Sequence, residues 1–598
     1  MKNYTRKSVT LTGGYLFEKQ ELNRKITVNS VYDRFKETGR IDAFRFEYKE
    51  GDEIVPHVFW DSDVAKWMEG AAYILAEHKD AELEAKVDEL VALIKKNQCE
   101  DGYFNIYFTV VEPAERFKKR SKHELYCAGH LMEAAVAISE CLGKRDMLEC
   151  MERYADYIYK VFVEERSAAF VTPGHEEIEL ALIRMYCHTG KKKYLDLAEF
   201  FINKRGTLDE KSNQVNCEYC QSHIPVREQR EALGHSVRAM YLYTGMARLA
   251  KHTNDAELMT ACKALFEDTT EKKMYVTGGL GSTNIGEAFT TPYDLPNDGA
   301  YTETCAGIGL MFFAHAMQEL ENDSKYADAI ERVLYNGVLS GLSLDGKSFF
   351  YENPLEINLS ERFENTCGKR RFPANRRVEC FSCSCCPPNV VRLLPSIQEY
   401  VYGVDGDTLF VNQYISSKLS SDSISCVMST DYPRENTVSI KANGIKSVAL
   451  RIPFWCDSFT LNKLYKMNNG YAVVECDGGD IEISFDMPAK AVWANVNVLR
   501  DAGRICIMKG PVVYCAEAVD NKSNLHRYSI APDLEYKVID DGYGLPSLEV
   551  NAYETLESSG SLYSSVRPEK VRTKLKLIPY NAFANREACD MAVWFREE

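Results

Sequence analysis

Apolar residues recur at helical spacing through the first four hundred residues of the chain. The clearest segment is 175–202, where Ile178, Leu182 and Met185 share one helical face and a polar turn ending at Gly190 separates them from a second amphipathic helix. The same order of helix, short polar turn and helix recurs around Asp80, Gly143, Asn254 and Asp323. The pattern predicts a series of helical hairpins.

The first helix of each predicted hairpin begins with polar residues that can do chemistry. These residues are Asp63, Glu124, His175, His235, Glu303 and, for a sixth helix, Cys386. Six hairpins can stack as an open solenoid or close into a ring. Because a ring would bring all six helix starts to one end, their shared polarity favours an (α/α)6 barrel over residues 1–404.

Beyond residue 404 the hydrophobic period changes to two, which is typical of half-buried strands. The predicted strands cover residues 408–414, 447–452, 480–485, 505–508 and 511–515. Gly-rich and Asn-rich turns separate several of them. We therefore expect a multidomain α + β protein, with a β-sandwich over 405–500 and a second β-sandwich or C-terminal β region over 501–598.

The charge, the apolar segments and the cysteine content of the chain limit which partners and which cellular compartment we expect. Lys and Arg total 72 against 88 Asp and Glu, a net charge of −16, and no basic run occurs, which argues against a nucleic-acid or membrane partner. No segment has the apolar length of a membrane span, and the first residues contain no apolar signal region. The 20 cysteines then indicate reduced thiols used for metal binding or catalysis, and a cytoplasmic protein. A homo-oligomer is compatible with the sequence.

The most specific chemical feature is the segment Cys380-Phe381-Ser382-Cys383-Ser384-Cys385-Cys386-Pro387-Pro388. Four cysteines in seven residues far exceed the average of about one in thirty in this chain. The Pro-Pro pair predicts a helix start, whose dipole stabilises thiolates. Buried inert cysteines or a structural zinc site are the alternatives, but adjacent Cys385 and Cys386 are unusual in structural sites.

Partner ligands are expected from another hairpin start, where Glu303 and Cys305 stand two residues apart. Together with Cys385 and Cys386 they would form a site of three sulfurs and one oxygen, suited to Zn²⁺. A competing pair, Cys217 and Cys220, has ligand spacing but no evident second pair. We interpret that pair as incidental.

Other candidate residues lie in glycine-containing segments. Glu287 follows a Gly-rich loop shortly before Glu303, although a single loop glutamate is usually solvated. His130, His175 and His235 each follow a glycine near a hairpin start, and together they suggest a polyol-binding pocket. His123 is a weaker candidate of the same kind.

These motifs resemble glycoside hydrolase family 127, whose best-known activity is that of a β-L-arabinofuranosidase. The resemblance rests on His123-Glu124-Leu125-Tyr126-Cys127-Ala128-Gly129-His130, Gly286-Glu287-Ala288-Phe289, Glu303-Thr304-Cys305 and Cys383-Ser384-Cys385-Cys386-Pro387-Pro388-Asn389, and it extends to Lys509-Gly510-Pro511 and Ala584-Asn585-Arg586. Before the cysteines, Arg377-Val378-Glu379-Cys380-Phe381 departs from the family's usual Trp-Phe. That departure bears on pocket shape and therefore on the sugar.

The resemblance implies an (α/α)6 barrel followed by β-sandwiches and a retaining glycosidase that releases L-arabinofuranose from plant-derived oligosaccharides. Carried over residue by residue, Cys385 is the nucleophile and Glu287 the acid/base. Glu303, Cys305, Cys385 and Cys386 bind zinc, and His130, His175 and His235 contact the sugar. Glu331 and Tyr351 are further candidates for the pocket.

Three alternatives stay open at this point. The first is a hydrolase of the same family acting on another furanosidic sugar, such as the branched acidic sugar of rhamnogalacturonan II. The second is a sugar epimerase or lyase, classes that also use helical barrels and histidines but need no thiolate cluster. The third is a non-enzymatic carbohydrate-binding or scaffold protein that contains zinc.

Overall fold

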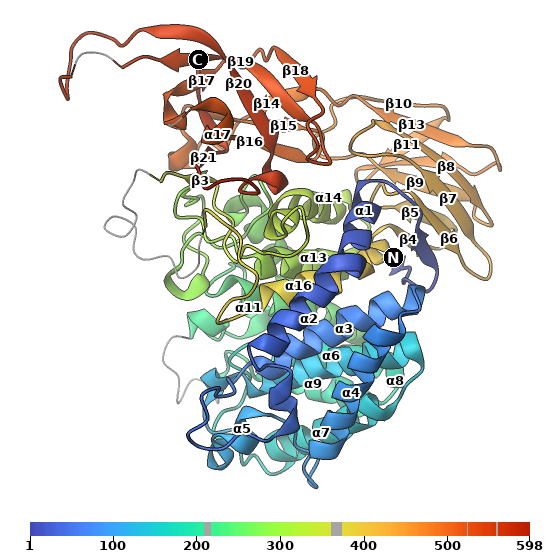
Figure 1. The fold of residues 1–598 in the computed structure, drawn as a ribbon. Helices are drawn as coiled ribbons and strands as arrows, with labels where there is room; N and C mark the ends of the chain where they lie inside the picture. Colours follow the sequence, from blue (N-terminus) through green and yellow to red (C-terminus); the bar gives the residue numbers. More distant parts are fainter. Residues whose placement is uncertain (209–216, 360–373, 523, 558–559) are drawn as a thin grey trace.

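Helices form the first four hundred residues and strands form most of the remainder. The computed structural model describes residues 1–598 apart from 209–216, 360–373, 523 and 558–559. Figure 1 shows the helices in blue to yellow, with the orange and red strands gathered above them. The expectation of a mixed, multidomain protein with a β-rich C-terminal part is confirmed.

Six helices begin at the polar positions that the sequence singles out. They are α3 (Trp60–Glu77), α6 (Glu124–Leu142), α8 (Ile178–Thr189), α11 (Ser236–Thr253), α13 (Thr304–Gln318) and α16 (Cys386–Leu393). Each packs against the next along the chain, and α16 packs against α3, so the set closes on itself. Their sides are buried nearly all round, as in α6, where every residue from Glu124 to Ser139 is buried.

A second set of helices covers the first. Its members are α4 (Ala81–Asn97), α7 (Asp146–Tyr159), α9 (Lys192–Lys204), α12 (Ala256–Asp268) and α14 (Ser324–Val333), each packed on the inner helix before it, and α2 (Val28–Glu37), which contacts α3 and α16. The predicted turns join the two sets. Asp80 caps α4 by accepting the backbone N–H groups of Glu82 and Leu83, and Gly190 ends α8 at φ 70°.

Three short helices complete the α-helices of the described residues: α1 (Tyr15–Leu22), α5 (Tyr107–Val110) and α17 (Ala518–Asn521). A bilayer-spanning helix needs a long apolar run, and none of the helices in the described part of the chain has one.

The strands form three sheets. The first has the order β1 (Lys2–Asn3), β4 (Tyr402–Asp405), β5 (Thr408–Val411), β9 (Ser447–Arg451), β12 (Tyr471–Glu475), β11 (Tyr465–Asn468). The second has the order β10 (Phe459–Leu461), β13 (Ile481–Phe485), β8 (Thr437–Asn443), β7 (Ser425–Ser429), β6 (Ser417–Ser420), β2 (Val9–Leu11). Every second residue of β8 is buried, as the alternating pattern requires.

The third sheet contains most of the C-terminal strands. Its order is β14 (Ala489–Val492), β15 (Arg504–Lys509), β22 (Trp594–Glu597), β17 (Tyr528–Ile530), β19 (Ser547–Thr555), β20 (Lys570–Pro579), β16 (Val512–Glu517), β21 (Met591–Ala592), β3 (Glu356–Ile357), with β18 (Tyr536–Ile539) paired to β19. All five strands predicted from the sequence are present as β5, β9, β13, β15 and β16.

Strands from the helical part of the sequence complete these sheets. Lys2 pairs with Val404, and Val9 pairs with Leu419, so the first eleven residues form an edge of both the first and the second sheet. β3, which follows α14 in the chain, pairs with β21 at the edge of the third sheet. Backbone pairing therefore ties the helical part of the chain to all three sheets.

An ion pair buried between α14 and the strands reinforces this tie. Glu331 lies 2.6 Å from Arg451 of β9, and both side chains are fully buried. Tyr432 and Trp455 also donate hydrogen bonds to the Glu331 carboxylate, at 2.6 Å and 3.1 Å. The suggestion that Glu331 reaches the substrate pocket is therefore wrong, because its carboxylate is used at the boundary between helices and strands.

We expect Glu331→Gln to destabilise the protein by about 3 kcal/mol, because it leaves the Arg451 guanidinium buried with only Asp328 as a charged partner at 2.7 Å. Urea unfolding followed by tryptophan fluorescence measures this directly, since Trp455 contacts Glu331. Asp407→Asn is the matched control, because Asp407 pairs with Lys446 on the surface, where both side chains are more than half exposed. Equal stabilities of the two variants would contradict the assigned role.

Candidate active site

The N-terminal ends of the six inner helices surround a cavity of about 160 Å³. Its wall consists of Phe59, Ser62 and Asp63 at α3, His123 and Tyr126 at α6, His175 before α8, His235, Val237 and Arg238 at α11, Glu303 and Cys305 at α13, Cys383 and Cys385 before α16, and the loop residues Tyr219, Glu287 and Tyr351. One site therefore receives side chains from six helix ends that are far apart in sequence.

Four residues at the starts of α13 and α16 converge as candidate metal ligands, and three of them are in the cavity wall. Cys305 Sγ lies 3.4 Å from Cys385 Sγ and 3.3 Å from Cys386 Sγ, and Glu303 Oε1 lies 3.5 Å from Cys385 Sγ. The ligand atoms of all four lie within 4.8 Å of one another. The structure thus brings together the complete set predicted from the sequence. Within the described residues, no such group includes the competing pair, Cys217 and Cys220.

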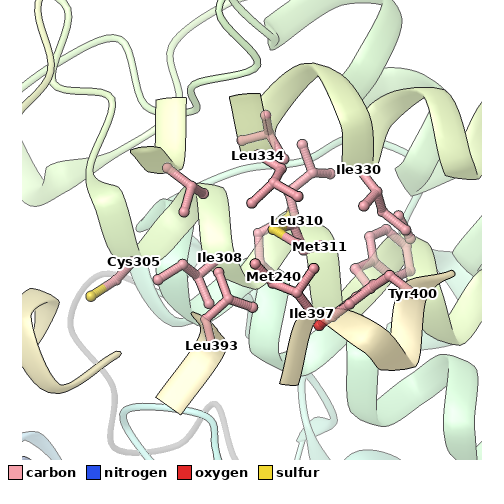
Figure 2. Close-up of a cluster of buried hydrophobic side chains, with 14 of the residues drawn as sticks. Met240, Cys305, Ile308, Leu310, Met311, Ile330, Leu334, Leu393, Ile397 and Tyr400 are labelled. Carbon is pink, nitrogen blue, oxygen red and sulfur yellow. The ribbon is translucent and has the colours of Figure 1, made fainter. Parts of the chain in front are cut away.

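The helices that carry the four ligands meet at this point. Cys305 is the second residue of α13 and Glu303 its N-cap, while Cys386 begins α16 and Cys385 is its N-cap. Figure 2 shows Cys305 at the edge of the apolar core between these helices, with its sulfur directed away from Ile308 and Leu393. Packing of the two helices therefore fixes where the ligands lie, and both helix dipoles favour negative charge there.

The ligand spacing fits a tetrahedral metal ion. Zinc–sulfur bonds of about 2.3 Å place two sulfur ligands about 3.8 Å apart in a regular tetrahedron. The sulfur–sulfur separations here are 3.3, 3.4 and 3.8 Å, far longer than a disulfide bond. Glu303 Oε2 is buried and has no hydrogen-bond partner among the described residues. Three sulfurs and an otherwise unsatisfied carboxylate fit a thiophilic divalent cation.

The pKa values of the four residues without a cation also indicate a cation site. Burial and the neighbouring Cys385 and Glu287 raise the pKa of Glu303 well above its usual range. Burial and hydrogen bonds with Cys305 and Cys385 likewise raise the pKa of Cys386. Burial opposes ionisation of Cys305 too, but hydrogen bonds with the other two thiols lower its pKa to about 6. Burial thus keeps Glu303 and Cys386 neutral on their own, whereas a dication would stabilise their charged forms.

Glu287 faces the same cavity from the loop before α13. Its backbone has φ 54°, and its Oε2 lies 2.8 Å from Nε2 of His235. The carboxylate oxygens of Glu287 and Glu303 lie within 4.8 Å of each other. An acid/base candidate and a thiol candidate, Cys385, therefore border one cavity, as the sequence predicts.

The histidines divide into two groups. His175 and His235 line the cavity, as does His123, the weaker candidate. His130 does not line it: its side chain is fully buried, and Nδ1 lies 3.0 Å from Glu177 Oε1. The prediction that His130 faces the sugar is thus not supported, because it lies seven residues, about 10 Å of helix, deeper in α6 than His123.

All the cavity histidines are neutral at pH 7. Burial, with the charge of Arg238, lowers the pKa of His123 to about 3 and takes that of His175 well below its usual range. Burial also lowers the pKa of His235, against the opposing effect of Glu287. The histidines therefore offer hydrogen bonds rather than positive charge to a ligand.

Tyr351, the remaining pocket candidate, lines the cavity, and the Cys385 thiol donates to its hydroxyl at 3.4 Å. None of the residues from Arg377 to Phe381, where the sequence departs from the family pattern, is in the cavity wall. Tyr219 and Arg238 are also in the wall, although neither was predicted from the sequence. Arg238 is in the first turn of α11, so the polarity of helix starts was a usable signal for it, whereas Tyr219 comes from a short 3-10 helix, Glu218–Cys220, that carries no such signal.

Comparison with known proteins identifies the family. Residues 8–399 match the description "Beta-L-arabinofuranosidase, GH127 catalytic domain", and residues 489–596 match "Glycoside hydrolase family 127 C-terminal domain". The chain belongs to glycoside hydrolase family 127. The expectation of a glycoside hydrolase is thereby confirmed.

Relatives within family 127 cover almost the whole chain. A non-reducing end β-L-arabinofuranosidase of Bifidobacterium longum subsp. longum is 36% identical, with 91% of this chain and 90% of the relative aligned. A solved GH127 β-L-arabinofuranosidase of Geobacillus stearothermophilus T6 matches with a TM-score of 0.93 at 38% identity, over 99% of this chain and 100% of the other. A solved GH127 β-arabinofuranosidase matches with a TM-score of 0.90 at 33% identity, over 100% and 98% of the two chains.

We expect the purified protein to contain one divalent metal ion per chain, measured by inductively coupled plasma mass spectrometry. Cys305→Ser should lower the metal content several-fold, because a hydroxyl is a much poorer ligand than a thiolate for such an ion. Cys217→Ser is the matched control and should retain the metal. Loss of metal from the control together with full retention in Cys305→Ser would overturn the ligand assignment.

Proposed function

We propose that the chain is a retaining exo-β-L-arabinofuranosidase that releases L-arabinofuranose from the non-reducing end of plant-derived β-L-arabinofuranosides. The observation that carries the proposal is a thiol, Cys385, facing a small cavity that also contains the carboxylate of Glu287. The activities of the similar proteins support the sugar. A cavity bounded by six helix ends supports removal of one terminal sugar rather than cleavage within a chain.

Cys385 is our candidate nucleophile because it is the most accessible thiol of the metal group. It is half-buried, whereas Cys305 and Cys386 are buried, and Cys386 is not in the cavity wall. Cys385 is the N-cap of α16, where the helix dipole favours negative charge. A thiolate in this place would take the role that a carboxylate has in most retaining glycosidases.

The reaction would proceed in two displacements. In the first, Cys385 Sγ forms a bond to the anomeric carbon as the bond to the glycosidic oxygen breaks, and Glu287 gives its proton to that oxygen. In the second, Glu287 takes a proton from water, the water oxygen bonds to the anomeric carbon, and Cys385 leaves as a thiolate. Two inversions at one carbon give net retention.

We propose zinc as the ion held by Glu303, Cys305, Cys385 and Cys386, because three sulfurs and one oxygen at tetrahedral spacing match its preferences. Bound zinc would keep these thiols deprotonated at neutral pH. His123 and His175, which line the cavity, would donate to and accept from the sugar hydroxyls, with His123 replacing His130 in that set. His235 also lines the cavity, but its Nε2 faces Glu287 at 2.8 Å.

The cyclic packing of the inner helices supports an (α/α)6 barrel, and we propose the division into residues 1–404, 405–500 and 501–598 with one amendment. β1, β2, β3, β4 and β14 would belong with the sheets in which they pair, so β14 would fall in the C-terminal part. The described cysteines are unpaired, which supports a reducing, cytoplasmic location and substrates small enough to be imported.

The proposed roles of Cys385 and Glu287 predict different losses of activity when each residue is replaced. Cys385→Ser should lower kcat for a p-nitrophenyl β-L-arabinofuranoside by at least about 10³-fold, because it removes the nucleophile. Glu287→Ala should lower kcat/KM by about 10² to 10⁴-fold on a hydroxyproline-linked arabinofuranoside, and less on the p-nitrophenyl substrate, whose leaving group needs little protonation.

Released arabinose is measured by chromatography, and azide is added to the Glu287→Ala reaction. Azide needs no base catalysis, so we expect it to restore turnover and yield a β-configured glycosyl azide. Wild-type rates in either variant, or hydrolysis by the wild-type protein with inversion, would refute the mechanism. The variant Cys187→Ser, at an exposed cysteine outside the cavity, should behave as wild type.

A further inference from the structure

The loop that carries Glu287 is fastened to the start of α11. Phe289 N donates to Gly234 O at 2.9 Å, and His235 and Ala288 form an antiparallel bridge. Ser236 Oγ donates to the backbone oxygen of Glu287 at 3.2 Å. The backbone of Glu287 and the start of α11 therefore move together.

His235 is itself held by the same helix start. Its backbone N–H donates to Tyr219 O at 3.3 Å, and Gly234 before it has φ 72° with Glu218 O only 2.0 Å from where a Cβ would stand. Its ring is the N-cap of α11, and Nδ1 accepts from the backbone N–H groups of Val237 and Arg238 at 3.2 and 3.4 Å. Both the place and the orientation of the ring are thus determined by backbone contacts.

This capping also determines which ring nitrogen carries the proton. A nitrogen that accepts backbone N–H groups must present its lone pair, so Nδ1 is unprotonated. The neutral ring, which burial favours, then carries its only N–H on Nε2. Nε2 lies 2.8 Å from Glu287 Oε2 and therefore donates to it.

We propose that His235 is a positioning residue for the acid/base Glu287, and that α11 fixes its tautomer for this purpose by using Nδ1 as the helix cap. The inference rests on the proposed function and deepens it. One carboxyl oxygen of Glu287 is tied to Nε2–H, and this sets the direction in which the other oxygen meets the glycosidic oxygen and, later, the attacking water.

The geometry separates this role from two others. A sugar contact alone would leave Nε2 directed at the substrate, whereas here it is directed at Glu287. A metal-ligand role is suggested by the grouping of His235, Glu287 and Glu303 within 4.8 Å, but a nitrogen that carries a proton has no lone pair for a metal.

Two substitutions separate the two functions of the His235 ring, which are capping α11 and donating to Glu287. In His235→Asn the side-chain oxygen occupies the place of Nδ1 and keeps the helix cap, but nothing reaches Glu287. In His235→Gln the terminal amide nitrogen is as many bonds from Cα as Nε2 and can still donate to Glu287, while the cap is lost. Measurements of kcat, KM, metal content and thermal stability are made for both.

For His235→Asn we expect kcat/KM on a hydroxyproline-linked arabinofuranoside to fall about 10- to 100-fold, because kcat/KM reports the step in which Glu287 protonates the leaving oxygen. On the p-nitrophenyl substrate kcat/KM should fall only a few-fold, with metal content and melting temperature close to wild type. His235→Gln should melt lower but recover part of the lost kcat/KM. This dependence on the leaving group separates positioning of an acid from a merely structural role.

Four results would overturn the inference: a large rise in KM on both substrates with kcat retained, loss of the metal in His235→Asn, equal losses of kcat/KM on both substrates, or wild-type kinetics in His235→Asn. Failure of the proposed function would be recognised separately, because the wild-type protein with its metal would then release no arabinose from either substrate.

Discussion

Three thiols and a carboxylate lie together at one point in the interior, and they can be ionised there only if positive charge offsets their negative charge. The rest of the site depends on this constraint. Two helix N-termini, those of α13 and α16, converge on the point, and the ligand spacing accepts a tetrahedral cation. Helix dipoles alone contribute too little to ionise several buried groups. The four residues therefore fit a cation that would supply the positive charge, while the helices supply the geometry.

The inner helices pack into a closed ring, and this closure brings the residues of the site together. Glu303 and Cys386 are separated by more than eighty residues, and Glu287, His235 and His175 come from still earlier elements. Side chains so distant in sequence meet because α16 packs back against α3 and completes the ring. The ring leaves its polar helix starts facing one cavity and its apolar sides facing one another, as in the core around Cys305 in Figure 2.

Much of this arrangement could be predicted from the sequence because the chemically reactive residues stand at the starts of helices. Glu303, Cys305, Cys385 and Cys386 stand at helix N-termini, where a periodic pattern gives their position to within a residue or two. The prediction that His130 contacts the sugar is not supported, because His130 lies seven residues beyond His123, the N-cap of α6, and a resemblance of motifs does not reveal depth along a helix. The prediction that Glu331 reaches the pocket is wrong, because its partners, Arg451, Tyr432 and Trp455, come from the β-rich part of the chain, and no local sequence pattern records that packing.

The short strands at the beginning of the chain have a consequence for folding kinetics. Residues 2 and 3 pair with residues 403 and 404, so this contact closes a loop of about four hundred residues. Contacts of such separation form slowly, because the entropy of a long loop must be overcome before the pairing contributes. During synthesis, residues 2–11 emerge about four hundred residues before the strands that pair with them. Ordering of the first residues therefore belongs to the last stages of folding.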